Sequence, residues 1–148
     1  MATRYAVRLK TTKVKEPDFP YDSQYVFDTS KGVAQFIRSL QDSDVEKFVV
    51  LFLSSVGKLN CIQVWEGTVN YAHLYPREIM KHALLSGSSS IILAHNHPSG
   101  LTVFSSEDEK LTGQIKELCA MMGIKLLDHV LLGASGSYVT INGCTGHI

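Results

Sequence analysis

Two histidines and an aspartate have the residue types and the spacing of a metal site. His95 and His97 end an apolar run, residues 90–94, and Asp108 follows after a short polar segment. In an extended segment, residues i and i+2 point to the same side, so both imidazoles can face one ion. Asp108 falls in the first turn of a predicted helix, from which its carboxylate can turn back to the same point.

This donor set indicates zinc and hydrolytic chemistry. Two nitrogens and one oxygen leave a fourth position for water, which is the arrangement of catalytic zinc sites. Calcium and magnesium favour sites made of oxygen alone, so we expect one zinc ion per chain. An interpretation without metal stays open, because Ser105-x-x-Asp108 is also the pattern of a helix capping box.

Other metal motifs are absent from the sequence. There is no HExxH segment of the kind found on the helices of metalloproteases. There is no HxE followed by PCxxC, the signature of zinc nucleotide deaminases. The chain of 148 residues is also too short for the TIM barrel that some hydrolases with an HxH segment adopt.

Hydrophobic periodicity predicts the elements that hold these residues. Apolar residues at helical spacing from Val33 to Leu40 predict a helix that Thr29 or Ser30 caps and that residues 41–44 end. The apolar run at 47–55 predicts a buried strand. We expect further strands at 59–67, 68–74, 90–94, 125–133 and 137–141, and further helices at 76–87 and 106–122. This order predicts an α/β sandwich with a central mixed sheet.

The composition is that of an ordinary globular protein, with 45% hydrophobic and 19% charged residues. No apolar stretch reaches the length of a membrane span, and the N-terminus lacks the apolar core of a signal peptide. The 3 cysteines form no CxxC pair and suit no disulfide framework. We therefore expect reduced thiols, a cytoplasmic location and no membrane partner.

Charge is uneven along a chain whose formal net charge is zero. Residues 1–15 hold five of the 14 basic residues and no acidic one, which leaves nine basic against 14 acidic residues in the rest. Such an arm could contact nucleic acid, but we favour a solvated tail or an edge strand at 4–14. We divide the chain into a basic arm and connector, residues 1–24, and one domain, residues 25–148.

The motif residues resemble those of a known superfamily. His95-x-His97, seven residues, and then Ser105-x-x-Asp108 match the JAMM (JAB/MPN) metalloenzyme motif at every required position. Neighbouring segments make the chain similar to the RadC-like branch over about residues 27–148, namely Ala94–Gly100, Glu66–Thr68, Pro76–Ile79 and Leu127–Val130. The resemblance implies a three-layer α/β/α sandwich with a central mixed sheet, of the cytidine-deaminase-like kind.

The resemblance also implies a role for each motif residue. His95, His97 and Asp108 would be the zinc ligands. Ser105 would help to hold the oxyanion or the water at the metal. A glutamate ahead of the first core strand is the general base in this superfamily, and Glu46 stands in that place. Two rivals for the same role are Glu66, beside Trp65, and Glu78, on a predicted helix.

These roles imply a zinc-dependent hydrolase, most simply a metallopeptidase or isopeptidase. The carboxylate base would take a proton as water attacks a carbonyl carbon, and then protonate the leaving amine. The alternatives are a RadC-like module that acts with DNA and a metal-dependent nuclease in DNA repair or mobile-element biology. The single acidic ligand weighs against a nuclease with two metal ions, which needs several carboxylates. The substrate and the oligomeric state stay open.

Other reactive residues have simpler interpretations. His129, in a predicted strand, could assist a ligand, but we expect a buried histidine hydrogen-bonded to the backbone. Arg77 and Lys81 are expected on a solvated helix face rather than in a substrate groove. The family often has histidine where this chain has Tyr75, a departure that lies outside the metal motif.

Overall fold

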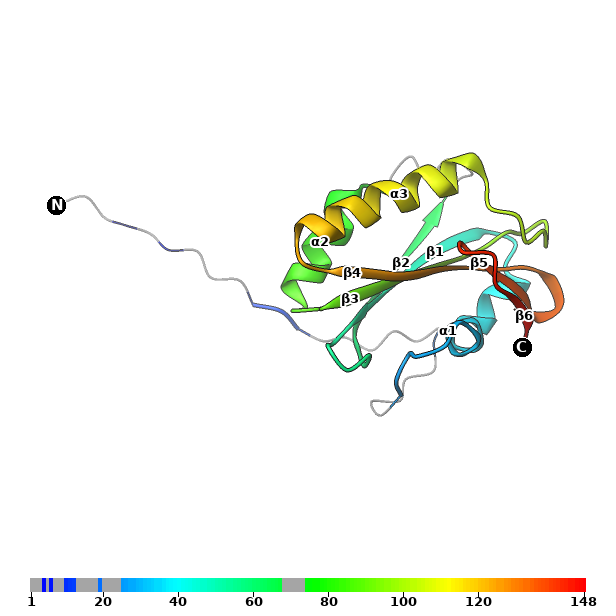
Figure 1. Cartoon of the computed structure of the whole chain (residues 1–148), viewed down its shortest axis with the longest axis horizontal. Helices are drawn as coiled ribbons and strands as arrows, with labels where there is room; N and C mark the ends of the chain where they lie inside the picture. Colours follow the sequence, from blue (N-terminus) through cyan, green and yellow to red (C-terminus); the bar gives the residue numbers. More distant parts are fainter. Residues whose placement is uncertain (1–3, 5, 7–9, 13–18, 20–24, 68–73) are drawn as a thin grey trace.

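The computed structural model describes residues 4, 6, 10–12, 19, 25–67 and 74–148. These residues form a six-stranded mixed sheet with helices on both faces, which confirms the predicted α/β fold (Figure 1). The strand order across the sheet is β2-β1-β3-β4-β5-β6, and among these neighbours only β3 and β4 run parallel. The strands are β1 (Glu46–Leu53), β2 (Leu59–Gly67), β3 (Ser90–Asn96), β4 (Lys125–Leu132), β5 (Ser137–Thr140) and β6 (Thr145–His147).

Alternating side chains of the central strands pack into two hydrophobic cores, one on each face of the sheet. Helix α1 (Ser30–Phe36) covers one face, and helices α2 (Pro76–Leu85) and α3 (Ser106–Met121) cover the other (Figure 1). Along β1, Val49 and Leu51 pack on the α1 side, whereas Phe48 and Val50 pack on the side of α2 and α3. Strands β1 and β3 are therefore apolar on both faces, as their continuous apolar runs predict.

The first predicted helix is shorter than its periodicity indicates. It ends at Phe36, and a 3-10 helix, η1 (Arg38–Asp42), follows. Residues three apart align on a 3-10 helix, which keeps both Ile37 and Leu40 buried. A second short 3-10 helix, η2 (Ala134–Gly136), joins β4 to β5.

The C-terminal end has one strand more than the sequence predicts. The three-residue strand β6 pairs with β5, and such a short segment carries no periodic signal of its own. Residues 68–73 of the strand predicted at 68–74, and most of the strand predicted at 4–14, lie outside the described residues, and Leu74 is not in a strand. Within the predicted connector, Phe19 is buried and stacks on Phe36, with 5.5 Å between ring centroids. None of the helices in the described part of the chain has the length and apolarity needed to cross a membrane.

Candidate metal centre

Strand β3 brings the two histidines of the HxH segment to its C-terminal end. His95 is fully buried, and the strand's two-residue period puts His97 on the same face, the one covered by α2 and α3. The backbone N–H of His97 donates to the carbonyl of Leu132 at the end of β4 (3.3 Å). The chain then turns at Gly100, whose φ of 78° favours glycine.

The loop after His97 is held against the turn between β4 and β5. The N–H of Ala134 donates to the carbonyl of Gly100 at 3.2 Å. A Cβ atom placed on Gly133 would lie 2.7 Å from that same carbonyl oxygen, so only glycine permits this approach. The loop that separates the histidines from α3 is therefore fixed by backbone contacts.

A capping box at the start of α3 delivers Asp108. The hydroxyl of Ser105 accepts from the N–H of Asp108 (3.1 Å), and the N–H of Ser105 donates to Oδ2 of Asp108 (2.9 Å). The interpretation of these residues as a helix cap is confirmed, and it does not compete with the metal interpretation. The cap fixes the carboxylate that faces the histidines.

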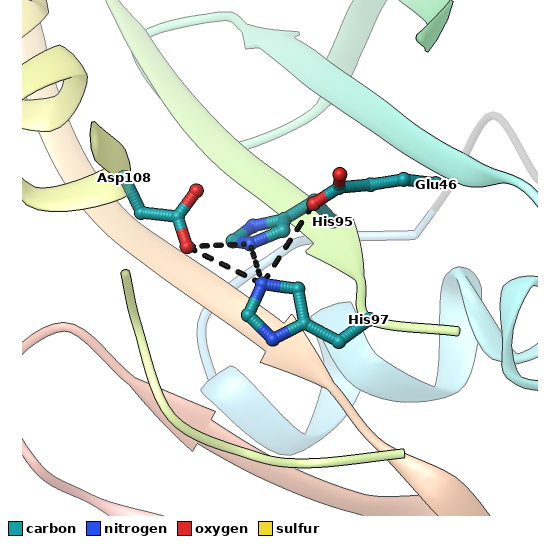
Figure 2. A group of neighbouring side chains, drawn as sticks. All are labelled: Glu46, His95, His97 and Asp108. Carbon is teal, nitrogen blue, oxygen red and sulfur yellow. Dashed lines mark hydrogen bonds and ion pairs between the residues drawn. The ribbon is translucent and has the colours of Figure 1, made fainter. Parts of the chain in front are cut away.

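Three ligand atoms converge where the sequence predicts a metal ion (Figure 2). Nε2 of His95 lies 3.1 Å from Nε2 of His97 and 3.3 Å from Oδ2 of Asp108, and Nε2 of His97 lies 3.3 Å from the same oxygen. Glu46 completes the group, since its Oε1 lies 3.7 Å from Nε2 of His97. All four ligand atoms lie within 4.8 Å of one another.

These separations fit a tetrahedral zinc ion. With zinc–ligand bonds of about 2.0–2.1 Å, two ligands of a tetrahedron lie roughly 3.3–3.4 Å apart. The three distances among His95, His97 and Asp108 are 3.1, 3.3 and 3.3 Å. Two imidazole nitrogens and a carboxylate oxygen also match the donors that zinc prefers. The donor set therefore fits one ion held by three side chains.

Hydrogen bonds fix which nitrogen of His97 faces the site. Its Nδ1 lies 3.1 Å from the carbonyl oxygen of Leu101, which can only accept, so Nδ1–H is the donor. In the neutral ring, Nε2 then carries a lone pair directed at His95 and Asp108. This is the tautomer that a metal ligand requires.

Hydrogen bonds from Thr112 through His129 orient the ring of His95 by its Nδ1 atom, on the side away from the proposed metal position. The hydroxyl of Thr112 donates to the backbone carbonyl of Asp108 (2.7 Å) and so accepts from Nδ1–H of His129 (2.6 Å). Burial lowers the pKa of His129 well below its ordinary value, and the neighbouring His95 lowers it further, so His129 is neutral near pH 7. Nε2 of His129 then accepts from Nδ1–H of His95 (2.8 Å), so in the neutral ring of His95 the lone pair is on Nε2, the nitrogen that faces His97 and Asp108.

The expectation that the backbone satisfies the ring of His129 is therefore wrong. Both of its nitrogens contact side chains, those of His95 and Thr112. Thr112 lies four residues after Asp108 in α3, and this spacing on one helix face is the sequence signal that could have indicated it. Phe104 packs beside both rings, with centroids 5.8 Å from His95 and 5.0 Å from His129.

The electrostatics of the site favour a cation. Burial opposes ionisation of Asp108, but in the metal-free site hydrogen bonds from protonated Nε2 atoms of His95 and His97 outweigh this and hold the pKa of Asp108 well below its usual range. The hydrogen bond with Asp108 raises the pKa of His97, although partial burial acts against the rise. The carboxylate of Asp108 thus stays ionised and attracts positive charge to Nε2 of His97.

Sheet register brings Glu46 to the site from a distant part of the sequence. Phe48 of β1 lies opposite His95 of β3, so continuing the antiparallel register by two residues sets Glu46 opposite His97. Glu46 is the first residue of β1, whereas the sequence places it just before the strand. Its side chain is 13% exposed, so it is close to the predicted ligands and still reached by solvent.

The two rival glutamates lie elsewhere. Glu66 pairs with Lys47 across β1 and β2, on the sheet face opposite to Glu46, and the Glu66 carboxylate lies 3.4 Å from Nζ of Lys47. Glu78 is in α2 and forms an ion pair with Lys81 at 3.2 Å. Neither belongs to the group of described side chains that could hold a metal ion.

A family model described as the RadC-like JAB domain matches residues 27–145, which include every residue of the site. The chain belongs to the RadC-like JAB domain family. This confirms the resemblance drawn from the motif, and the residues matched include a group of side chains that could hold a metal ion.

The RadC-like chain is similar to curated proteins that carry the description UPF0758. It is 45% identical over 100 residues to a UPF0758 protein of Histophilus somni, a match that covers 67% of this chain and 45% of that protein. It is 39% identical over 117 residues to a UPF0758 protein of Methylibium petroleiphilum, which covers 78% and 52%. The chain spans about half the length of the curated relatives it matches.

Proposed function

We propose that the chain is a zinc-dependent hydrolase that cleaves peptide or isopeptide bonds. The observation that carries this proposal is the trio His95, His97 and Asp108, whose ligand atoms are separated by 3.1–3.3 Å with Glu46 beside them. Zinc in this place supplies Lewis acidity and lowers the pKa of water towards about 7. Three ligands from the protein leave one position for that chemistry.

Glu46 acts as the proton carrier in the proposed reaction. Its Oε1 takes the proton of the water that attacks the substrate carbonyl, and the same oxygen then gives this proton to the leaving nitrogen. This role needs a carboxylate beside the ligands that is not itself shielded from substrate. The part-exposed side chain of Glu46 next to His97 meets both needs.

Ser105 is proposed as a further participant through its hydroxyl proton. Its oxygen accepts from the N–H of Asp108, and its O–H can still donate towards an oxyanion. Its capping role stands whether or not it also contacts substrate. We keep the cytoplasm as the proposed location and one zinc ion per chain as the proposed stoichiometry.

Activity profiling tests the proposed reaction. Zinc-loaded protein is incubated with peptide, isopeptide-linked and nucleic-acid libraries, and Glu46→Gln is the test variant. We expect Glu46→Gln to bind zinc and to lose roughly 10²–10⁴-fold in the rate of peptide or isopeptide cleavage. Glu66→Gln is the matched control, because Glu66 lies on the opposite face of the sheet. An unchanged rate of cleavage in Glu46→Gln would refute the role of Glu46 as the base. Cleavage of nucleic acid and of no peptide or isopeptide substrate would show that the protein is a nuclease and not a peptidase.

A further inference from the structure

Asn96 stands between the two histidines, and its side chain reaches across to β1. It is 2% exposed and points to the sheet face opposite to His95 and His97. Its Oδ1 accepts from the backbone N–H of Lys47 at 2.7 Å, and its Nδ2 donates to the backbone carbonyl of Val45 at 3.1 Å. The two hydrogen bonds therefore hold the backbone on both sides of a single residue, Glu46.

These hydrogen bonds lie where the regular pairing of β1 with β3 stops. Paired residues run from Leu53 and Ser90 to Phe48 and His95. Asn96 still pairs with Leu132 of β4, but its backbone is not paired with β1, and Pro98 has no N–H with which to extend a ladder. The side chain of Asn96 thus joins the two strands at the end that carries Glu46, where strand ends otherwise fray.

We propose that Asn96 is a positioning residue that fixes Glu46 opposite His97. This inference rests on the proposed role of Glu46 as the base. The chemistry of the contact selects an amide, because a backbone N–H can only donate and a carbonyl can only accept. Aspartate would lose the donor, and alanine would lose both groups. One tripeptide, residues 95–97, then supplies two metal ligands from one face and the anchor of the base from the other.

Positioning of this kind matters because a general base must come within about 2.6–3.2 Å of the proton it takes. Glu46 is at the first position of β1, where it pairs with Gly67 of β2 on one side and the side chain of Asn96 provides the bridge to β3 on the other. Releasing Val45 and Lys47 from Asn96 would let the backbone of Glu46 move, while the ligands stay fixed by β3, by the cap of α3 and by His129. Asn96 therefore affects the base and spares metal binding.

The test measures zinc binding and the response of Glu46 to zinc separately. Wild type and Asn96→Ala are labelled with ¹³C at the glutamate side-chain carboxyls, and the Glu46 resonance is assigned by its absence in Glu46→Gln. Competition with a chromophoric chelator gives the zinc affinity. We expect Asn96→Ala to keep the zinc affinity of the wild type and to lose the zinc-induced shift of the Glu46 resonance.

Asn60→Ala is the matched control. Asn60 also bridges two segments by its amide, to the carbonyl of Ser86 and the hydroxyl of Ser88, and it lies at the other end of the sheet. We expect Asn60→Ala to keep the shift of Glu46. With a substrate in hand, Asn96→Ala should lower kcat by about 10²-fold at unchanged KM, and by far less in a Glu46→Gln background.

The same zinc-induced shift in Asn96→Ala as in the wild type overturns the inference. If Asn96→Ala does not fold, Asn96→Ser carries the same prediction, because a serine hydroxyl is too short to reach both backbone groups. Failure of the wild type to bind zinc refutes the proposed function itself. Normal zinc binding with an unchanged Glu46 response refutes only the role of Asn96.

Discussion

Nε2 of His129 lies 2.8 Å from Nδ1 of His95, and both rings are completely buried. This contact joins β4, which carries His129, to the predicted metal ligand His95 on β3. Because Thr112 holds the other nitrogen of His129, the orientation and the tautomer of His95 depend on two residues that are not themselves among the predicted metal ligands. Partners of this kind tune metal affinity in many proteins.

Removing the hydroxyl of Thr112 should weaken zinc binding. Thr112→Val keeps the side-chain shape but removes the acceptor for Nδ1–H of His129, which frees that ring to turn away from His95. Loss of such a partner typically lowers metal affinity by roughly 10–100-fold. Competition with a chelator measures the affinity, and Thr112→Ser, which keeps the hydroxyl, is the control. Equal affinity in Thr112→Val and Thr112→Ser would refute the orienting role of this chain of hydrogen bonds.

The cap of α3 should stabilise the protein even without metal. Ser105→Ala removes the acceptor for the N–H of Asp108, and loss of an N-cap costs about 0.5–2 kcal/mol. Urea unfolding of the metal-free protein measures this cost apart from any role in catalysis. Ser106→Ala is the control, because Ser106 is exposed and is not the capping residue. An unfolding free energy unaffected by Ser105→Ala would show that the cap does not hold Asp108.

The meeting of the three proposed metal ligands could be predicted from the sequence because local structure places each of them. The alternation of a strand aligns His95 with His97, and the first turn of a capped helix presents Asp108. Each of these rules acts over a few residues. The loop between the end of β3 and the start of α3 is short, so these two segments can be expected to lie close together whatever the rest of the fold is.

Glu46, Asn96 and His129 depend instead on how strands pair. Their partners lie 34–51 residues away, and a shift of one residue in register would turn every side chain to the other face. The sequence contains no local signal for these registers. The family resemblance indicated Glu46, but nothing indicated the other two contacts, and the general expectation that a buried histidine bonds to the backbone gave a wrong partner for His129.

Cys119 should make stability depend on pH in the alkaline range. Burial raises the pKa of its thiol to about 11 from the ordinary 9.0, so the unfolded chain releases this proton at lower pH than the folded chain. The contribution of this thiol to the free energy of unfolding is complete below about pH 9 and is lost as pH rises towards about 11. The total loss is roughly 2–3 kcal/mol. Urea unfolding between these values should show a loss in wild type that is smaller in Cys119→Ala and unchanged in Cys144→Ser, which alters an exposed thiol. An equal loss in Cys119→Ala would rule out this thiol as the cause.

The zinc content of the purified chain tests the metal centre most directly. Native mass spectrometry should find one zinc ion per chain in wild type and in His147→Ala, an exposed histidine outside the site, and none in His95→Ala. The reason is that His95 supplies one of only three ligands, and its loss leaves two. Zinc retained in His95→Ala, or a metal-free wild type that is folded and fully active, would contradict the account.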